Sequence, residues 1–229
     1  FDSGMGCYAM RPSDYETFKP FFSRALIQYH NQGRTEKIEL DTAHVNNWKL
    51  AGVEGLPESG QLDLTELGLT DPLSMRVRVG RNLEKFALPG AMTKEDRIRF
   101  EKTMLAAFDK LKANPDYGGC VYSLTRNADW KEVTGEDANP NLITDEKYHE
   151  LVKAHVLFKD IAADPYLASA GIASHWPCGR GCYQSEDKQF IIWFGEEDHL
   201  RIMCMKKGTV LNEVFDRLRS ALELVDGLP

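Results

Sequence analysis

The chain has 229 residues, a formal net charge of −7 at pH 7 and 42% hydrophobic residues. This length and composition are ordinary for a soluble globular protein with one large domain, or a small domain beside a larger one. The acidic balance argues against a nucleic-acid-binding protein. No apolar run approaches the roughly 20 residues that a membrane span needs. We therefore expect neither a nucleic acid nor a membrane as a partner.

Five scattered cysteines favour reduced thiols and a cytoplasmic location. Cys178 and Cys182 lie four residues apart, but no second Cys/His pair follows at a spacing typical of zinc sites. We therefore predict no metal-ligating residues in this chain.

The first part of the chain predicts a helical segment. Ser13 and Asp14 are candidate N-caps for a helix over 15–29. Its aromatic stripe is expected to face a core and consists of Tyr15, Phe18, Phe22 and Tyr29. Residues 34–48 could hold a further short helix or turn. Gly, Pro and acidic residues then gather over 52–71. We place a linker at 56–71, between a partial helical domain at 1–55 and a second domain at 72–229.

The segment from Ser74 to Gly80, SMRVRVG, alternates in polarity and predicts a strand. On a strand, Ser74, Arg76 and Arg78 point to one face, and the apolar residues between them point to the other. An ordinary amphipathic strand with solvated arginines would give the same pattern, so the pattern alone leaves both interpretations open.

The middle of the chain predicts two helices and a strand. Thr93 caps a helix that runs to about Lys112. Residues 120–124 form a short strand, and the polar stretch 126–141 forms a surface loop. Thr144 caps a second helix through about Phe158, which carries His155. A lone histidine on a helix is more often structural than functional.

The C-terminal part predicts a helix over 165–174, a turn at 177–181 that displays Arg180, and a final amphipathic helix over 211–225. Helices come first, and short strands then alternate with helices. This order favours an α+β fold with an antiparallel β-sheet flanked by helices.

The stretch FIIWFGEEDHLRIMCM, residues 190–205, predicts two short buried strands around an acidic tip. Burying Glu196, Glu197 and Asp198 is costly unless cations meet them. Arginine is the preferred side chain for phosphate oxygens, and a nearby carboxylate could hold a cationic substrate or take its proton. No GxxxxGK, GxGxxG, GxSxG or HExxH motif occurs. The residues therefore permit a site for a phosphate and a cation.

Three segments resemble the phosphagen (ATP:guanidino) kinases. They are SGMGCYAMRPSDYETFKPFF, LTDPLSMRVRVGRNLEKFALP and WPCGRGCYQSEDKQFIIWFGEEDHLRIMCMKKG. The likeness runs from about Ser3 to Val225 and is nearest to the arginine kinase type. It implies a small helical N-terminal domain followed by a larger catalytic domain with an antiparallel sheet. It also implies reversible transfer of the ATP γ-phosphoryl group to a guanidino substrate.

The resemblance assigns roles to particular residues. Glu197 would hold the guanidinium and act as the catalytic base. ATP would be bound by Ser74, Arg76, Arg78, His155 and Arg201. The carboxylate end of the substrate would be held by Ser3, Gly4, Met5 and Tyr8. Arginine is the guanidino compound implied, Mg²⁺ would be held mainly by ATP or ADP, and the protein would be a monomer or homodimer.

The chain also departs from the family pattern. Met75 and Gly195 replace the usual hydroxyl residue and asparagine, and the 126–141 stretch is longer than usual. The family begins before the point matching Phe1 and continues well past the point matching Pro229. We therefore expect a fragment, truncated at both ends, with little or no catalysis by itself. A nucleotide-binding pseudokinase and a kinase of arginine within proteins are the alternatives.

Overall fold

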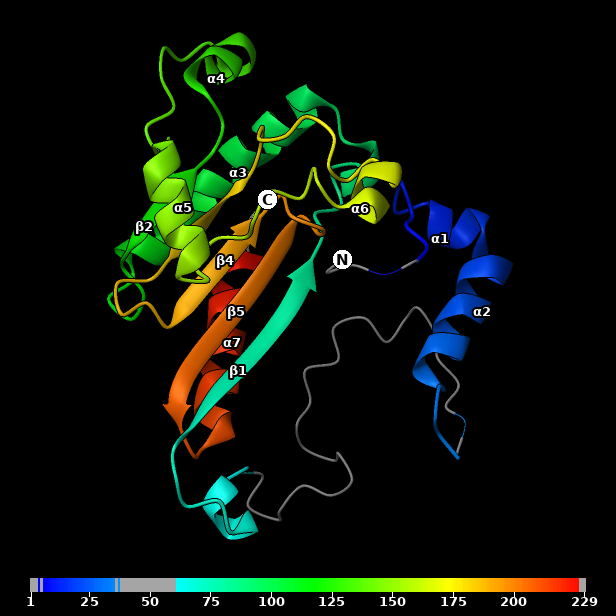
Figure 1. Ribbon diagram of the computed structural model, residues 1–229, viewed down its shortest axis with the longest axis vertical. Helices are drawn as coiled ribbons and strands as arrows, with labels where there is room; N and C mark the ends of the chain where they lie inside the picture. Colours follow the sequence, from blue (N-terminus) through cyan, green and yellow to red (C-terminus); the bar gives the residue numbers. More distant parts are fainter. Residues whose placement is uncertain (1–3, 5, 36, 38–60, 227–229) are drawn as a thin grey trace.

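The computed structural model describes residues 4, 6–35, 37 and 61–226. Its centre is a five-stranded antiparallel sheet with the strand order β1-β5-β4-β3-β2. The strands are β1 (Leu73–Arg81), β2 (Cys120–Ser123), β3 (Gly181–Gln184), β4 (Phe190–Phe194) and β5 (Leu200–Gly208). Figure 1 shows the two long strands β1 and β5 side by side. The α+β prediction and the hairpin at 190–205 are therefore confirmed.

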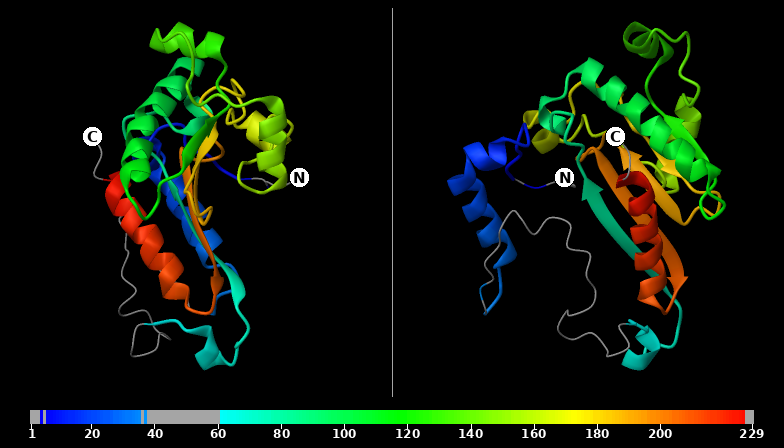
Figure 2. Two further views of the ribbon diagram at one scale, coloured as in Figure 1. Left: turned by 90° about the vertical axis from the view of Figure 1, so that its left-hand side faces the viewer. Right: turned by 180° about the vertical axis from the view of Figure 1, so that it is seen from behind.

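Two long helices cover one face of the sheet, as Figure 2 shows from the side. They are α3 (Lys94–Ala113) and α7 (Leu211–Asp226). Helix α3 begins at the predicted cap, where Thr93 and Asp96 form a reciprocal capping box. Between the helices and the sheet lies the main core, to which α3 contributes Phe108, β4 Phe190 and α7 Leu218. Because strand side chains alternate between faces, Met75 of β1 joins this core while Ser74 and Arg76 do not.

A second core covers the opposite face over β3, β4 and β5. The side chains that complete this second core come from α5 (Asp145–Lys153), α6 (Pro165–Ser169) and the chain around these helices. Leu151, Phe158 and Ile172 pack there against Ile191 and Met203. This cover leaves the outward residues of β1 exposed.

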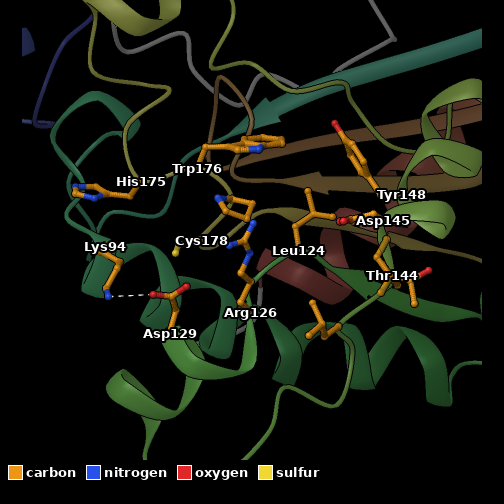
Figure 3. Close-up of a pocket in the computed structure, with 13 residues that line it drawn as sticks. Lys94, Leu124, Arg126, Asp129, Thr144, Asp145, Tyr148, His175, Trp176 and Cys178 are labelled. Atoms are coloured by element: carbon orange, nitrogen blue, oxygen red, sulfur yellow. Dashed lines mark hydrogen bonds and ion pairs between the residues drawn. The ribbon is translucent and has the colours of Figure 1, made fainter.

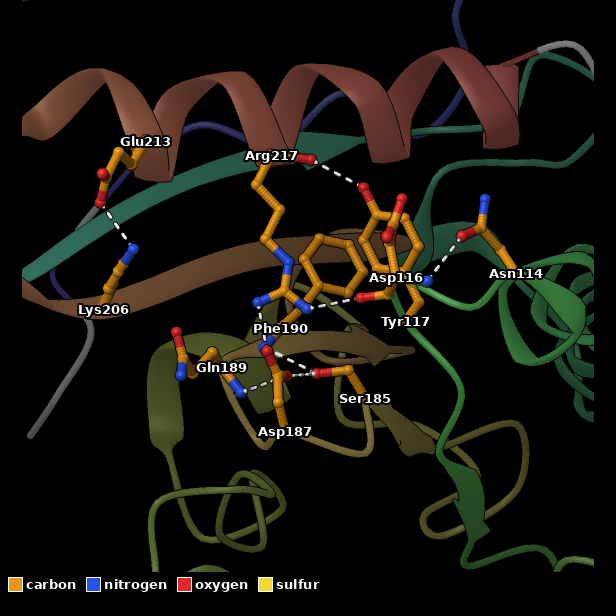
Figure 4. A network of polar contacts seen from close by, with 10 residues as sticks. All are labelled: Asn114, Asp116, Tyr117, Ser185, Asp187, Gln189, Phe190, Lys206, Glu213 and Arg217. Atoms are coloured by element: carbon orange, nitrogen blue, oxygen red, sulfur yellow. Dashed lines mark hydrogen bonds and ion pairs between the residues drawn. The ribbon is translucent and has the colours of Figure 1, made fainter.

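A polar network connects α7 to the β3–β4 turn and to residues 116–117, which precede β2 (Figure 4). Arg217 donates to the Asp187 carboxylate at 2.6 Å and to the Asp116 carbonyl at 3.0 Å. The Tyr117 hydroxyl donates back to the Arg217 carbonyl at 3.0 Å. The guanidinium helps to hold the pKa of Asp187 down at about 2 against the opposing effect of burial. The network fixes α7 relative to the β3–β4 turn.

The N-terminal helical prediction is correct in type and wrong in detail. The segment forms two helices, α1 (Asp14–Thr17) and α2 (Lys19–His30), which meet at Phe18. The aromatic stripe was expected to enter a core. Instead, Phe18 is 55% exposed and Tyr29 is 73% exposed, and neither α1 nor α2 has a fully buried residue. Periodicity identified an apolar stripe, but it could not show what covers that stripe.

Three further predictions need correction. The expected loop at 126–141 contains a helix, α4 (Asn127–Thr134), because Trp130 is buried beside α3 and anchors it. The helix after Thr144 ends at Lys153, so His155 lies beyond it with a positive φ of 57°. Helix α6 ends at Ser169 and not at Ser174.

The division into domains at 1–55, 56–71 and 72–229 stays a prediction. Residues 36 and 38–60 lie outside the described residues, and so does most of the short helix or turn considered at 34–48. Within the described part of the chain, no helix has both the length and the apolar composition needed to cross a bilayer.

Candidate active site

One face of the sheet carries a row of arginines. Arg76 and Arg78 are exposed on β1, and Gly80 of that strand is paired with Arg201 on β5. Residues directly opposite in an antiparallel pair point to the same face, and so do residues two apart on one strand. Arg76, Arg78 and Arg201 therefore share one face, which we call the arginine face.

Arg76 and Arg78 have no hydrogen bond or ion pair to any residue that the structure describes. Their guanidinium groups are therefore available to a ligand. Such planar forks donate paired hydrogen bonds that match phosphate oxygens. Ser74 is exposed on the same face, two residues before Arg76.

Arg201 joins the arginine face to the acidic tip between β4 and β5. Its guanidinium lies 2.8 Å from a Glu196 carboxylate oxygen and 3.3 Å from a Glu197 carboxylate oxygen. It also lies 5.7 Å from the centre of the Trp193 ring. The cation that the acidic tip requires is therefore supplied by the same strand pair.

Burial raises the pKa values of two carboxyl groups at this tip. The pKa of Glu196 rises because desolvation outweighs the attraction of Arg201, and the pKa of Asp198 rises for the same reason. These two groups are held by the protein, since Glu196 pairs with Arg201 and Asp198 interacts with Asn82. The Glu197 side chain is 32% exposed, against 14% for that of Glu196, and the N-terminal loop reaches it.

That loop brings Tyr8 to the tip. The Tyr8 hydroxyl donates a hydrogen bond of 2.5 Å to Glu197. Partial burial raises the pKa of Tyr8, and the hydrogen bond to Glu197 and its negative charge raise it further. Tyr8, Gly4 and Gly6 also line a small cavity of about 290 Å³ against α6. Ser3 and Met5, the other two predicted loop contacts, lie outside the described residues.

His199 is a buried residue of this site that the sequence prediction left without a role. Its Nδ1 accepts from the Leu83 backbone N–H at 2.9 Å, so Nε2 carries the proton and faces the Ala87 carbonyl at 2.8 Å. Burial lowers the pKa of His199 to about 4. The neutral ring therefore fastens the acidic tip to the chain that follows β1.

A family model described as "ATP:guanido phosphotransferase, C-terminal catalytic domain" matches residues 120–227. The arginine kinase Oct f 2 of Amphioctopus fangsiao is 32% identical over 98% of this chain and 56% of its own length. A solved taurocyamine kinase from Schistosoma mansoni, with bound transition-state-analogue components, is 31% identical with a TM-score of 0.69. This match covers 95% of the present chain and 27% of that protein. Residues 120–227 therefore belong to the phosphagen kinase family.

The creatine kinase M-type of Gallus gallus is also similar: it is 30% identical over 97% of this chain and 50% of its own length. A lombricine kinase structure, 22% identical with a TM-score of 0.65, shares the fold. The chain spans about half the length of several of the curated phosphagen kinases it matches.

Two further residues of the phosphagen kinase motifs take positions that differ from expectation. His155 was expected on a helix but lies beyond the end of α5. The carbonyl of its neighbour Val156 accepts a 2.7 Å hydrogen bond from the Trp193 indole, whose ring lies 5.7 Å from the Arg201 guanidinium. Arg180 was expected to be displayed by a turn, and this is wrong. It is fully buried and donates to four backbone carbonyls, including those of Gly195 and Cys178. The five donors of one planar guanidinium can satisfy several buried carbonyls at once.

Proposed function

We propose that this chain is part of an ATP:guanidino phosphotransferase with free arginine as the acceptor. In this proposal the chain contributes the arginine face and Glu197 to the active site. A single observation carries the proposal: Arg201 lies on the arginine face and also contacts Glu197. The arginines that would bind phosphate and the carboxylate that would bind the substrate guanidinium therefore meet at Arg201. The family membership supports the same reaction class.

Ser74, Arg76 and Arg78 would bind the phosphates of ATP, and Arg201 would extend the row toward the acceptor. His155 would contact the nucleotide from the other side of Trp193. A triphosphate carries several negative charges, so a row of guanidinium groups would neutralise the charge that develops during transfer. The site offers guanidinium donors, which suits Mg²⁺ held by phosphate oxygens and water rather than by protein ligands.

Glu197 would hold the substrate guanidinium and remove its proton. A free guanidinium has a pKa above about 12 and is a poor nucleophile unless a positioned carboxylate takes that proton. Tyr8 would orient Glu197, because its hydroxyl already donates to the carboxylate. The 4–8 loop and its cavity beside α6 would receive the carboxylate end of arginine. The choice of arginine rests on the likeness of this loop to that of arginine kinases.

The compartment is part of the same proposal. All five cysteines are unpaired, which supports a reducing environment such as the cytoplasm.

Nucleotide binding can be tested directly on this chain. Titration calorimetry with MgADP should show binding that Arg76→Gln and Arg78→Gln each weaken by about 10-fold or more, because each variant removes a charged hydrogen bond to phosphate. Arg99→Gln is the matched control, since Arg99 is an exposed arginine of α3 paired with Glu95. Unchanged affinity in both arginine-face variants would defeat the assignment.

Phosphoryl transfer should be assayed with the complete open reading frame that contains this chain. ATP-dependent formation of phosphoarginine is expected, and Glu197→Gln should lower its rate by about 100-fold or more. Absence of transfer to arginine and to other small guanidines, with ADP still bound, would instead favour a pseudokinase. Phosphoarginine formed only within a protein substrate would favour the protein-kinase alternative.

A further inference from the structure

A cavity of about 740 Å³ lies outside the arginine face. None of the residues predicted to bind ATP or guanidine lines it. Its wall is built where α3, α4 and α5 begin and where residues 175–178 cross between them (Figure 3). The volume lies within the range typical of small-molecule sites. Helix α4, which contributes to the wall, belongs to the 126–141 stretch that the sequence analysis expected to be longer than the family pattern.

One side of the cavity is flat and apolar. Trp176 is half-buried, and its ring is held by edge contacts with Tyr148 at 6.5 Å and Phe158 at 6.0 Å between ring centres. Leu124, Ile143 and other apolar side chains extend this side. A ring held in place at a cavity wall can contact a flat ligand at little cost in side-chain entropy.

Arg126 supplies a free cation within reach of this wall. Its side chain extends from the start of α4 toward Cys178 and the Trp176 side of the cavity (Figure 3). It has no hydrogen bond or ion pair to any described residue, whereas the nearby Asp129 is paired with Lys94 at 3.1 Å. Asp145 is the other carboxylate of the lining, and Figure 3 places it beside Thr144 at the Tyr148 end. Arg126 is therefore an exposed lining residue whose guanidinium pairs with no described carboxylate.

Two buried arginines lie close to lining residues of the cavity without lining it themselves. The Arg180 guanidinium lies 5.7 Å from the centre of the Trp176 ring. Arg97 is also buried, and two of its nitrogens, Nε and Nη1, have no partner in the described part of the chain. Both arginines are held by backbone carbonyls and have no ion pair with a described carboxylate. The pKa of His175, at the cavity rim, is lowered by burial and then by the charges of Arg97, Arg180 and Lys94.

We infer that this cavity binds a small organic anion that carries an aromatic group. The anionic group pairs with Arg126, and the aromatic group lies against Trp176. An unpaired guanidinium beside an apolar wall favours such a ligand over a neutral molecule of the same shape. The site is separate from the phosphoryl-transfer site and does not depend on the proposed activity.

Two matched dyes can test the inference. The probes are 8-anilino-1-naphthalenesulfonate and its uncharged counterpart N-phenyl-1-naphthylamine, which keeps the rings and lacks the sulfonate. The sulfonate dye should bind one high-affinity site, and Arg126→Gln should weaken this binding by about 10-fold or more, because a charge-assisted pair is lost. The same variant should leave binding of the neutral dye nearly unchanged. Lys131→Gln, on the exposed side of the same helix, is the control that should bind both dyes normally.

The exposed aromatics of α2 are an alternative place for dye adsorption, so Phe21→Ser is measured in parallel. Loss of sulfonate-dye binding in Phe21→Ser, with no effect of Arg126→Gln, would overturn the inference. Displacement of the dye by saturating MgADP would also overturn it, since the two sites would then coincide. Urea unfolding midpoints for each variant establish that weaker binding does not come from a misfolded protein.

Discussion

A buried carboxyl group beneath the sheet makes the stability of this protein depend on pH. Glu101 of α3 is fully buried and accepts hydrogen bonds from Ser123 Oγ and Thr125 Oγ1, both at 2.5 Å, and from Asn139 Nδ2 at 3.3 Å. Burial nevertheless raises the pKa of Glu101 to about 7, because desolvation of the carboxylate outweighs these three donors.

The size of the effect follows from the two pKa values. The ordinary value is 4.5 and the folded value is about 7, a difference worth about 3 kcal/mol. Between these values the folded protein binds more protons at this position than the unfolded chain. The stabilisation is therefore fully present below pH 4.5 and is lost as the pH rises to about 7 and above. Glu101→Gln cannot titrate, so it should remove this pH dependence.

The measurement is urea unfolding of the wild type and of Glu101→Gln between pH 5 and pH 8. The free energy of unfolding of the wild type, minus that of the variant, should fall by about 2–3 kcal/mol across this range. His199 titrates in the opposite sense, because its folded pKa of about 4 lies below the ordinary 6.5. Its stabilisation is present above pH 6.5 and is lost as the pH falls toward 4. Because both proteins contain His199, its effect cancels in the difference. A difference that stays constant with pH would refute the reasoning.

Three further predictions concern positions whose packing is explicit. Arg180→Gln should destabilise the fold by about 3 kcal/mol or more in urea unfolding, because the buried carbonyls that Arg180 satisfies lose their donor; a loss below about 1 kcal/mol would contradict this. Gly195→Ala should cost more than about 1 kcal/mol, since Gly195 has φ 73° and an added Cβ would meet the Gly179 carbonyl at 2.1 Å; an unchanged thermal midpoint would argue against it. Thr93→Ala should cost about 0.5–2 kcal/mol by removing the cap of α3, and Thr93→Ser, which keeps the hydroxyl, is its control.

Local sequence patterns predicted the parts of this fold in which one rule dominates. The alternation in 74–80 predicted strand β1 and its exposed arginines, because strand side chains point to opposite faces in turn. The Thr93 signal predicted the start of α3, because a cap acts within one helical turn. The acidic stretch between two apolar runs predicted the β4–β5 hairpin.

Other expectations failed where distant contacts outweigh local preference. The stretch 126–141 is polar and suggested a loop, but burial of Trp130 against α3 makes it a helix. Arg180 follows two turn residues and suggested an exposed side chain, but the carbonyls of Ile172, Ser174 and Cys178 and that of Gly195 on the next hairpin surround it. Turn propensity at 177–181 does not show that the preceding chain and Gly195 fold over this side chain.

The order of residues by itself determined the strand carrying Arg76 and Arg78, the acidic tip, and the arginine that follows it. Only the tertiary structure decided that Arg201 faces the same side as Arg76 and Arg78, that Tyr8 crosses to Glu197, and that a cavity opens beside Arg126. Strand register and loop docking depend on contacts between residues far apart in the chain, including the 189 positions that separate Tyr8 from Glu197. Periodicity depends only on residues that are near in the sequence. It therefore identified the arginines and the acidic tip, but it could not show which of these side chains come into contact in the fold.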